Sequence, residues 1–280
     1  MKYVSRKIKF FIIYISIALT IISSTSINHY KFTPSDRSVN TCVVNNLLPC
    51  DQPSTESRLR GYIPNLELSD KERFLSAIAR NLTAIPQADT FAYILLRAYG
   101  AAWVNQESAI TLPSTVIFAD EQETLDFQAN LKMAKVDGSR DCYLQESAAI
   151  ALNKAQKLTN IPLKSGYGAS DCTRSFATNL RFWHKYANNK TLEKVKQGKE
   201  TAILGIVAPP GTSQHLWGLA VDLRVSHDRQ RQALNQYGWF QTVENDVPHW
   251  TYVGLSEDEL SQFGFQNKVV RGITYWLTPL

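Results

Sequence analysis

The stretch from Ser213 to Asp222 reads SQHLWGLAVD and places a histidine and an aspartate in an otherwise largely apolar run. A second segment, from Asp246 to Tyr252, reads DVPHWTY and supplies another histidine with a carboxylate three residues before it. Two imidazoles and a carboxylate form the ligand set of a hydrolytic zinc site, in which three protein ligands leave one position open for water. The two segments together therefore predict a metal centre.

The residues after Gly218 alternate between apolar and polar. Leu219, Val221, Leu223 and Val225 are apolar, and Asp222 lies between them, so we expect a strand with one buried face. A straight strand would send His215 and Asp222 to opposite sides, and a turn at Gly218 would bring them together. The competing interpretation is a buried strand aspartate with an unrelated loop histidine.

The segment 213–222 fits the pattern SxHxxGxAxD and resembles the VanY-like D-alanyl-D-alanine carboxypeptidases, zinc peptidases related to the hedgehog fold. The segment ending in His249 and Trp250 is similar to the E-x-x-H-W ending of that family. The resemblance extends from about Cys142 to Gly254. It implies an α+β fold, in which a small antiparallel sheet carries the zinc site and helices flank it.

The resemblance also assigns the metal and the base. It implies that His215, Asp222 and His249 hold Zn²⁺ and that a water occupies the fourth position. A carboxylate must then take a proton from the water and pass it to the leaving amine. The family uses a glutamate three residues before the last histidine, and this chain has Asp246 there. Glu244 is the other candidate for the base.

The resemblance implies two substrate-binding residues, Arg174 and Ser213. The family has an S-G-Y-R-S strand followed by a helix with a glutamine five residues after the arginine. Here an insertion separates Ser165 from Arg174, and Asn179 stands in place of the glutamine. The fork of donors on Arg174 suits a substrate carboxylate. A surface helix cap is the alternative for this arginine.

The first 27 residues have the form of an export signal. Residues 1–9 carry four basic residues and no acidic residue, and the apolar run from Phe10 to Ile22 follows. An uncleaved membrane anchor stays open, because no clean cleavage site follows the run. Without these four residues the net charge falls from +5 to +1, so the charge gives no reason to expect nucleic-acid binding. We therefore expect an exported protein of the periplasm, cell envelope or medium.

The four cysteines, Cys42, Cys50, Cys142 and Cys172, suggest two disulfides in an exported chain. Three pairings are open, among them Cys142 with Cys172 and Cys42 with Cys50. A cysteine-rich metal site is the alternative, although the chain has no C-x-x-C spacing.

After residue 27 the sequence divides into three predicted regions. Residues 28–62 are polar and form a linker, residues 63–140 form a helical accessory region, and residues 141–280 form the VanY-like domain. The accessory region serves packing or binds the cell wall or a partner. The patterns predict helices that begin near Ser69 and cover 91–102, 121–134, 144–158 and 257–263. They predict short strands over 115–119 and 205–207, and the resemblance implies a strand at 165–167.

Two functions from different classes follow. The first is a zinc carboxypeptidase or endopeptidase that hydrolyses peptidoglycan stem peptides, with an activity weakened by the shorter Asp246. The second is an inactive zinc domain that binds cell wall or a protein partner. A serine hydrolase is disfavoured, because no G-x-S-x-G occurs and Ser213 lies beside a proposed metal ligand.

Overall fold

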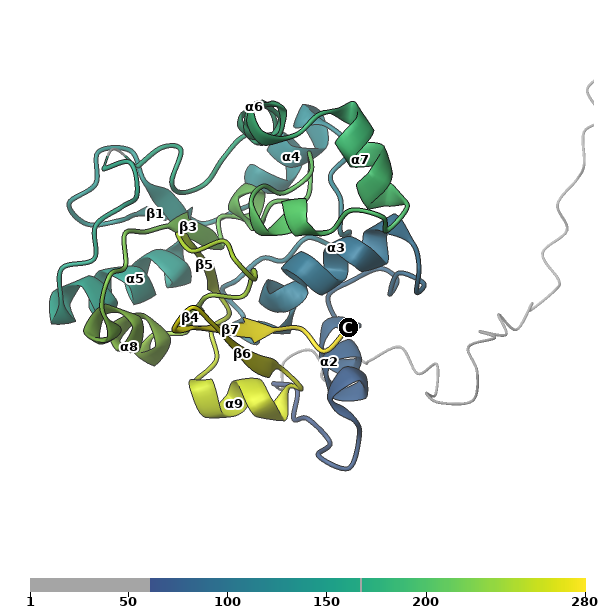
Figure 1. Ribbon diagram of the computed structural model, residues 1–280. Coiled ribbons are helices and arrows are strands. Elements are labelled where there is room, and N and C mark those ends of the chain that lie inside the picture. The colour runs from purple at the N-terminus through teal and green to yellow at the C-terminus, as the bar shows by residue number, and fades with distance from the viewer. Residues whose placement is uncertain (1–60, 167) are drawn as a thin grey trace, which may run out of the picture. The chain divides into compact units, whose positions relative to one another are not determined.

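The protein has an α+β fold, as the sequence predicts. A computed structural model describes residues 61–166 and 168–280 (Figure 1). Its helices are α2 (Asp70–Ile78), α3 (Phe91–Tyr99), α4 (Glu121–Gln128), α5 (Glu146–Leu158), α6 (Phe176–Tyr186), α7 (Asn189–Lys196), α8 (Asp228–Gln236) and α9 (Glu257–Gln262). Three 3₁₀ turns are η1 (Gly100–Val104), η2 (Ala202–Gly205) and η3 (Gln214–Trp217).

The strands within the described residues pair antiparallel in small sheets. They are β1 (Met133–Lys135), β2 (Tyr143–Gln145), β3 (Ala220–Asp222), β4 (Trp239–Phe240), β5 (His249–Tyr252), β6 (Gln266–Val270) and β7 (Ile273–Leu277). The central sheet has the order β3-β5-β4, while β1-β2 and β6-β7 form two-stranded sheets. Helices α5 and α8 lie together to one side of β3 and β5 (Figure 1). The small helix-flanked antiparallel sheet expected from the resemblance is therefore present.

The helices before residue 130 pack into the same core as the central sheet. Trp103 of η1 is fully buried, and its ring centroid lies 4.4 Å from that of Trp217 in η3. Phe118 donates its backbone N–H to the carbonyl of Gly211, just before η3. The predicted boundary between a helical region and a peptidase domain near residue 140 stays a prediction, but side chains from both sides share one core.

Several predicted elements are confirmed. Ser69 caps α2 in a capping box with Glu72, and α9 ends at Gln262, close to the predicted end. Helix α5 begins at Glu146 because the preceding residues pair with β1. Cys142 and Cys172 form a disulfide, whereas Cys42, Cys50, the predicted export signal and residues 28–60 of the predicted linker lie outside the described residues.

Other elements differ from the sequence patterns. The run 115–119 is not a strand: Val116 and Phe118 are buried as loop side chains. Helix α4 ends at Gln128 instead of residue 134, because the chain turns into β1. Residues 205–207 are not a strand: Gly205 is the last residue of the turn η2, and residues 206 and 207 follow it without strand pairing. Residues 165 and 166 form a bend, with an isolated bridge between Leu163 and Leu223 beside them.

Candidate metal centre

The turn at Gly218 brings His215 to the end of β3. Gly218 has φ of +67°, the left-handed conformation that glycine adopts without a Cβ clash. A Cβ there would also lie 3.2 Å from the backbone nitrogen of Gln145. The predicted reversal between His215 and Asp222 is therefore present, and glycine is required at its centre.

Strand pairing places the second histidine beside the aspartate. Asp222 of β3 and His249 of β5 are direct partners in the antiparallel register, where side chains of paired residues lie on the same face. The side chain of Asp222 reaches both rings through one oxygen: Oδ1 lies 3.4 Å from Nε2 of His215 and 3.8 Å from Nδ1 of His249.

These three groups fit a metal ion. All three residues are buried, and one ligand atom from each lies within 4.8 Å of the other two. Ligand atoms about 2.05 Å from a tetrahedral zinc lie roughly 3.3 Å apart, close to the two distances to Asp222. The buried Nε2 of His215 makes no hydrogen bond within the described residues. A buried nitrogen without a hydrogen, aimed at a carboxylate, is the arrangement that a cation stabilises.

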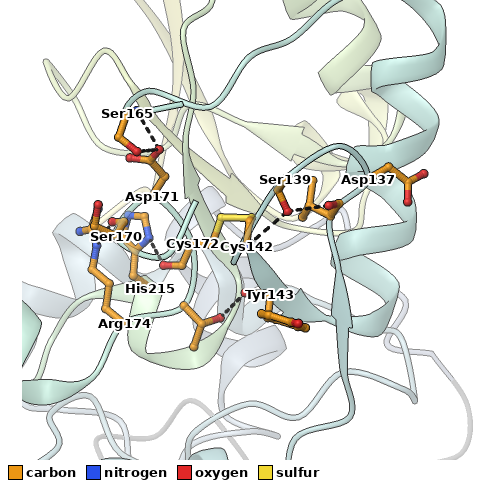
Figure 2. The surroundings of a disulfide bond; sticks show 12 residues. Asp137, Ser139, Cys142, Tyr143, Ser165, Ser170, Asp171, Cys172, Arg174 and His215 are labelled. Carbon is orange, nitrogen blue, oxygen red and sulfur yellow. Dashed lines mark hydrogen bonds between the residues drawn. A yellow bond between two sulfur atoms is a disulfide. The ribbon is translucent and has the colours of Figure 1, made fainter. Parts of the chain in front are cut away.

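Two acceptors on the far sides of the rings orient the imidazoles. Nδ1 of His215 donates to the carbonyl of Cys172 at 2.9 Å, which leaves Nε2 as the atom with a lone pair (Figure 2). Nε2 of His249 lies 2.7 Å from Oε1 of Gln214, which leaves Nδ1 toward Asp222. Both nitrogens that face the carboxylate therefore carry a lone pair that can bind a metal.

Electrostatics favour the same protonation states. Burial lowers the pKa of His215, and burial together with the neighbouring His215 lowers the pKa of His249 to about 3. Burial alone raises the pKa of Asp222, but His215, Arg174 and His249 lower it by more, so that it falls well below its usual range. The site thus holds two neutral imidazoles and one carboxylate near neutral pH, the forms that bind metals.

Arg174 and Lys164 supply positive charge beside Asp222. Nη2 of Arg174 lies 2.6 Å from Oδ2 of Asp222, and Nε donates to the carbonyl of Ser170. The guanidinium also covers the ring of Phe182 at 4.8 Å. Nζ of Lys164 lies 4.0 Å from the same Oδ2. Arg174 is therefore part of the site and is not a surface cap.

Asp246 faces the same cavity from the loop before β5. Burial and the charge of Asp222 raise the pKa of Asp246 to about 7, although Lys164 and Arg174 partly oppose this. A cavity of about 70 Å³ separates these groups. Its walls include Arg174, Ser213, Asp246, Phe182, Tyr186 and Ile206. Glu244, the other candidate base, instead pairs with Lys268 at 2.7 Å.

Ser213 lines the cavity but also has a structural role. It is buried, and its Oγ accepts the backbone N–H of His215 at 3.4 Å, at the start of η3. Its predicted contact with substrate stays a prediction.

The sequence patterns missed the residues that hold the ligands in place. Gln214 lies inside the motif and Cys172 was expected only as a disulfide partner, yet both contact a histidine. The buried Asp171 accepts hydrogen bonds from the backbone and hydroxyl of Ser165 (Figure 2). The backbone carbonyl of Asp171 also accepts the backbone N–H of Asp222. The presence of a polar glutamine in a buried run was the one signal for Gln214.

Comparison with known families supports the resemblance. Residues 132–267 match the family model VanY: D-alanyl-D-alanine carboxypeptidase. This segment, a little under half of the chain, holds all three candidate ligands, Asp246 and Arg174. No curated protein matches this chain significantly.

Three solved structures show weaker similarity. The vancomycin resistance D,D-dipeptidase VanXYg, in complex with a D-Ala-D-Ala phosphinate analogue, aligns with 53% of this chain and 78% of its own at 16% identity and a TM-score of 0.34. A mutant of the D,D-pentapeptidase VanY in complex with Zn(II) aligns with 45% of this chain and 81% of its own, at 18% identity and a TM-score of 0.31. The LD-carboxypeptidase LdcB aligns with 48% of this chain and 70% of its own, at 19% identity and a TM-score of 0.30.

Proposed function

We propose that the protein is a zinc-dependent carboxypeptidase or endopeptidase that hydrolyses peptidoglycan stem peptides. The observation that carries this proposal is the convergence of His215, Asp222 and His249 inside the segment that matches the carboxypeptidase family. Zinc bound by these residues would polarise the scissile carbonyl and acidify a water molecule.

Asp246 is the general base in this proposal. A base works best when its pKa lies near the working pH, and the pKa of about 7 meets that condition in the metal-free protein. Asp246 takes the proton of the attacking water and passes it to the leaving amine. Its carboxylate makes no hydrogen bond or ion pair that would compete with this role, as far as the described residues go.

Arg174 binds the terminal carboxylate of the substrate. Two of its five N–H groups are engaged, one by Asp222 and one by Ser170, so three remain for a ligand. The contact with Phe182 holds the guanidinium plane in place. A substrate carboxylate on Arg174 would bring the bond before it close to the metal ligands.

A location outside the cytoplasm agrees with this substrate. The disulfide between Cys142 and Cys172 is typical of oxidising compartments. Residues 61–280, apart from 167, contain no helix long and apolar enough to cross a membrane. We propose that the protein is exported and that its partner is the peptide part of the cell wall.

Hydrolysis of purified muropeptides, followed by mass spectrometry, tests the function. We expect cleavage with about one zinc per chain, loss of cleavage after chelation, and loss of both zinc and cleavage in His215→Ala. His184→Ala is a matched control, because this exposed histidine lies on α6 and should leave both unchanged.

The outcomes separate the candidate functions. Stoichiometric zinc in His215→Ala would reject the ligand assignment. Zinc-loaded wild-type protein that cleaves no muropeptide would favour the binding domain without activity. The mass of the products would also show which bond is cut.

A further inference from the structure

Gln214 is a buried polar side chain between η3 and β5. Its side chain is 1% exposed, and both ends of its amide are engaged. Nε2 donates to the backbone carbonyl of Tyr99 at 2.7 Å. Oε1 lies 2.7 Å from Nε2 of His249 and accepts a bond from Oγ1 of Thr251 at 2.9 Å.

This hydrogen-bond arrangement determines where the proton of His249 lies. The carbonyl of Tyr99 can only accept, so the amide nitrogen of Gln214 must face it. The amide oxygen therefore faces His249 and can only accept, which requires a proton on Nε2 of the ring. The lone pair then lies on Nδ1, the nitrogen that faces Oδ1 of Asp222 at 3.8 Å.

A competing tautomer exists. Without Gln214, the ionised Asp222 is the strongest nearby acceptor, and it would favour a proton on Nδ1. That proton would block the atom that has to bind the metal. Nε2 of His249 lies 2.7 Å from the amide oxygen of Gln214, whereas Nδ1 lies 3.8 Å from Oδ1 of Asp222. The shorter contact is the hydrogen bond, so the proton lies on Nε2.

We propose that Gln214 is a positioning residue that fixes the tautomer and ring orientation of His249 for metal binding; this inference rests on the proposed zinc site. Its own orientation comes from the backbone of α3, far away in the sequence, through the carbonyl of Tyr99. Partners of this kind typically change metal affinity by about 10–100-fold when removed.

The test compares Gln214→Met with a matched control, Gln145→Met. Gln145 is also 1% exposed, and its amide bonds to Thr111 and to the carbonyl of Trp217 in η3, but it contacts no candidate ligand. Zinc affinity is measured by chelator competition, and the histidine tautomers of the metal-free proteins are measured by ¹⁵N NMR.

We expect Gln214→Met to weaken zinc binding by about 10–100-fold and to move protonation of His249 from Nε2 toward Nδ1. Gln145→Met should lower thermal stability and leave both readouts unchanged. In neutral Gln214→Glu, one oxygen still accepts from His249 and the O–H can donate to the carbonyl of Tyr99, so this variant should retain the wild-type tautomer and rescue most of the affinity.

Two results would overturn the inference: wild-type zinc affinity in Gln214→Met, or a wild-type His249 that carries its proton on Nδ1. The tautomer is read in metal-free protein, without any substrate. A protein that binds zinc through an oriented His249 but cleaves no muropeptide would contradict the proposed function and leave the role of Gln214 intact.

Discussion

Asp246 is one methylene shorter than the glutamate that the resemblance to the carboxypeptidases implies at this position. The difference withdraws the carboxylate by roughly one C–C bond, about 1.5 Å. A displacement of about 1 Å at a reacting group can cost on the order of 100-fold in rate. The loop around Asp246 therefore has to bring the shorter side chain forward if the enzyme is to be fast.

Substitutions at Asp246 measure this. Asp246→Asn should keep full zinc and lose hydrolysis by about 10²–10⁴-fold, because it removes a base and not a ligand. Asp246→Glu restores the longer side chain: a faster enzyme would show that the native carboxylate falls short, and a slower one that the loop has adapted to aspartate. Steady-state kinetics and metal analysis provide both readouts, and unchanged hydrolysis in Asp246→Asn would reject this base.

The thermal stability of metal-free Asp246→Asn tests whether burial and the charge of Asp222 raise the pKa of Asp246 in the folded protein. The folded protein holds a proton on Asp246 up to about pH 7, while the unfolded chain releases it near pH 4. The stability from this group is therefore present below pH 4 and is lost as the pH rises through about 7. Asp246→Asn avoids that loss, so without metal it should unfold at a higher temperature than wild type at pH 8.

At the scale of elements, local patterns predicted the parts with strong local signals. The alternation after Gly218 and the capping box at Ser69 predicted a strand, a turn and a helix start that the structure contains. The prediction of a strand over 115–119 was wrong, because an apolar run alone does not distinguish a short strand from a buried loop. The exposed strand β6 carries little apolar signal, and its pairing with β7 went unpredicted.

This hairpin supports the loop of Asp246 from outside. Lys268 of β6 pairs with Glu244, and the backbone N–H of Trp276 in β7 donates to Gln241. The amide of Gln241 then donates to the carbonyl of Val247, inside the loop. Such long-range contacts carry no signature in a single sequence, so neither the support nor its function could be predicted.

The disulfide supports the other histidine. Cys172 is bonded to Cys142, and its carbonyl accepts the Nδ1 proton of His215 (Figure 2). A crosslink that closes a loop of about 30 residues stabilises by roughly 3–4 kcal/mol in the chain-entropy account. The variant Cys142→Ala/Cys172→Ala should therefore unfold at a lower temperature and bind zinc more weakly than wild type.

Thermal unfolding with and without zinc, together with chelator competition, checks this expectation. Non-reducing peptide mapping of the wild type is the control, and it should find no free thiol at either position. Unchanged zinc affinity in a folded double variant would show that the carbonyl of Cys172 keeps its place without the crosslink.

For the whole molecule, the site depends on residues well outside the ligand motifs. Side chains that bind metal have a recognisable type and spacing, so the sequence could nominate His215, Asp222 and His249. Their immediate supports are backbone carbonyls of Cys172 and, through Gln214, of Tyr99. A carbonyl is present on every residue, and for that reason these supports leave no trace in the sequence.

The fragment 132–280 tests whether the region that matches the carboxypeptidase family model folds without the helices before it. This fragment lacks residues 61–131, so it has no Tyr99 carbonyl to bind Gln214, and the face of Trp217 that Trp103 covers becomes exposed. Loss of one buried tryptophan side chain costs about 3–5 kcal/mol, and a domain is stable by only about 5–15 kcal/mol in total. We therefore expect no cooperative unfolding transition and no tight zinc binding, whereas the chain 61–280 retains both.

Trp103→Ala in the chain 61–280 is the milder form of the same experiment. It should lower the free energy of unfolding by about 3–5 kcal/mol and still leave a folded protein in which zinc affinity can be measured. If the fragment 132–280 instead melts cooperatively and binds zinc like the longer chain, residues 63–140 are an accessory region, as the sequence pattern predicts. A fragment that fails to fold would make the helices α2 to α4 part of the domain that carries the candidate metal centre, since they complete its core and orient one of the candidate ligands.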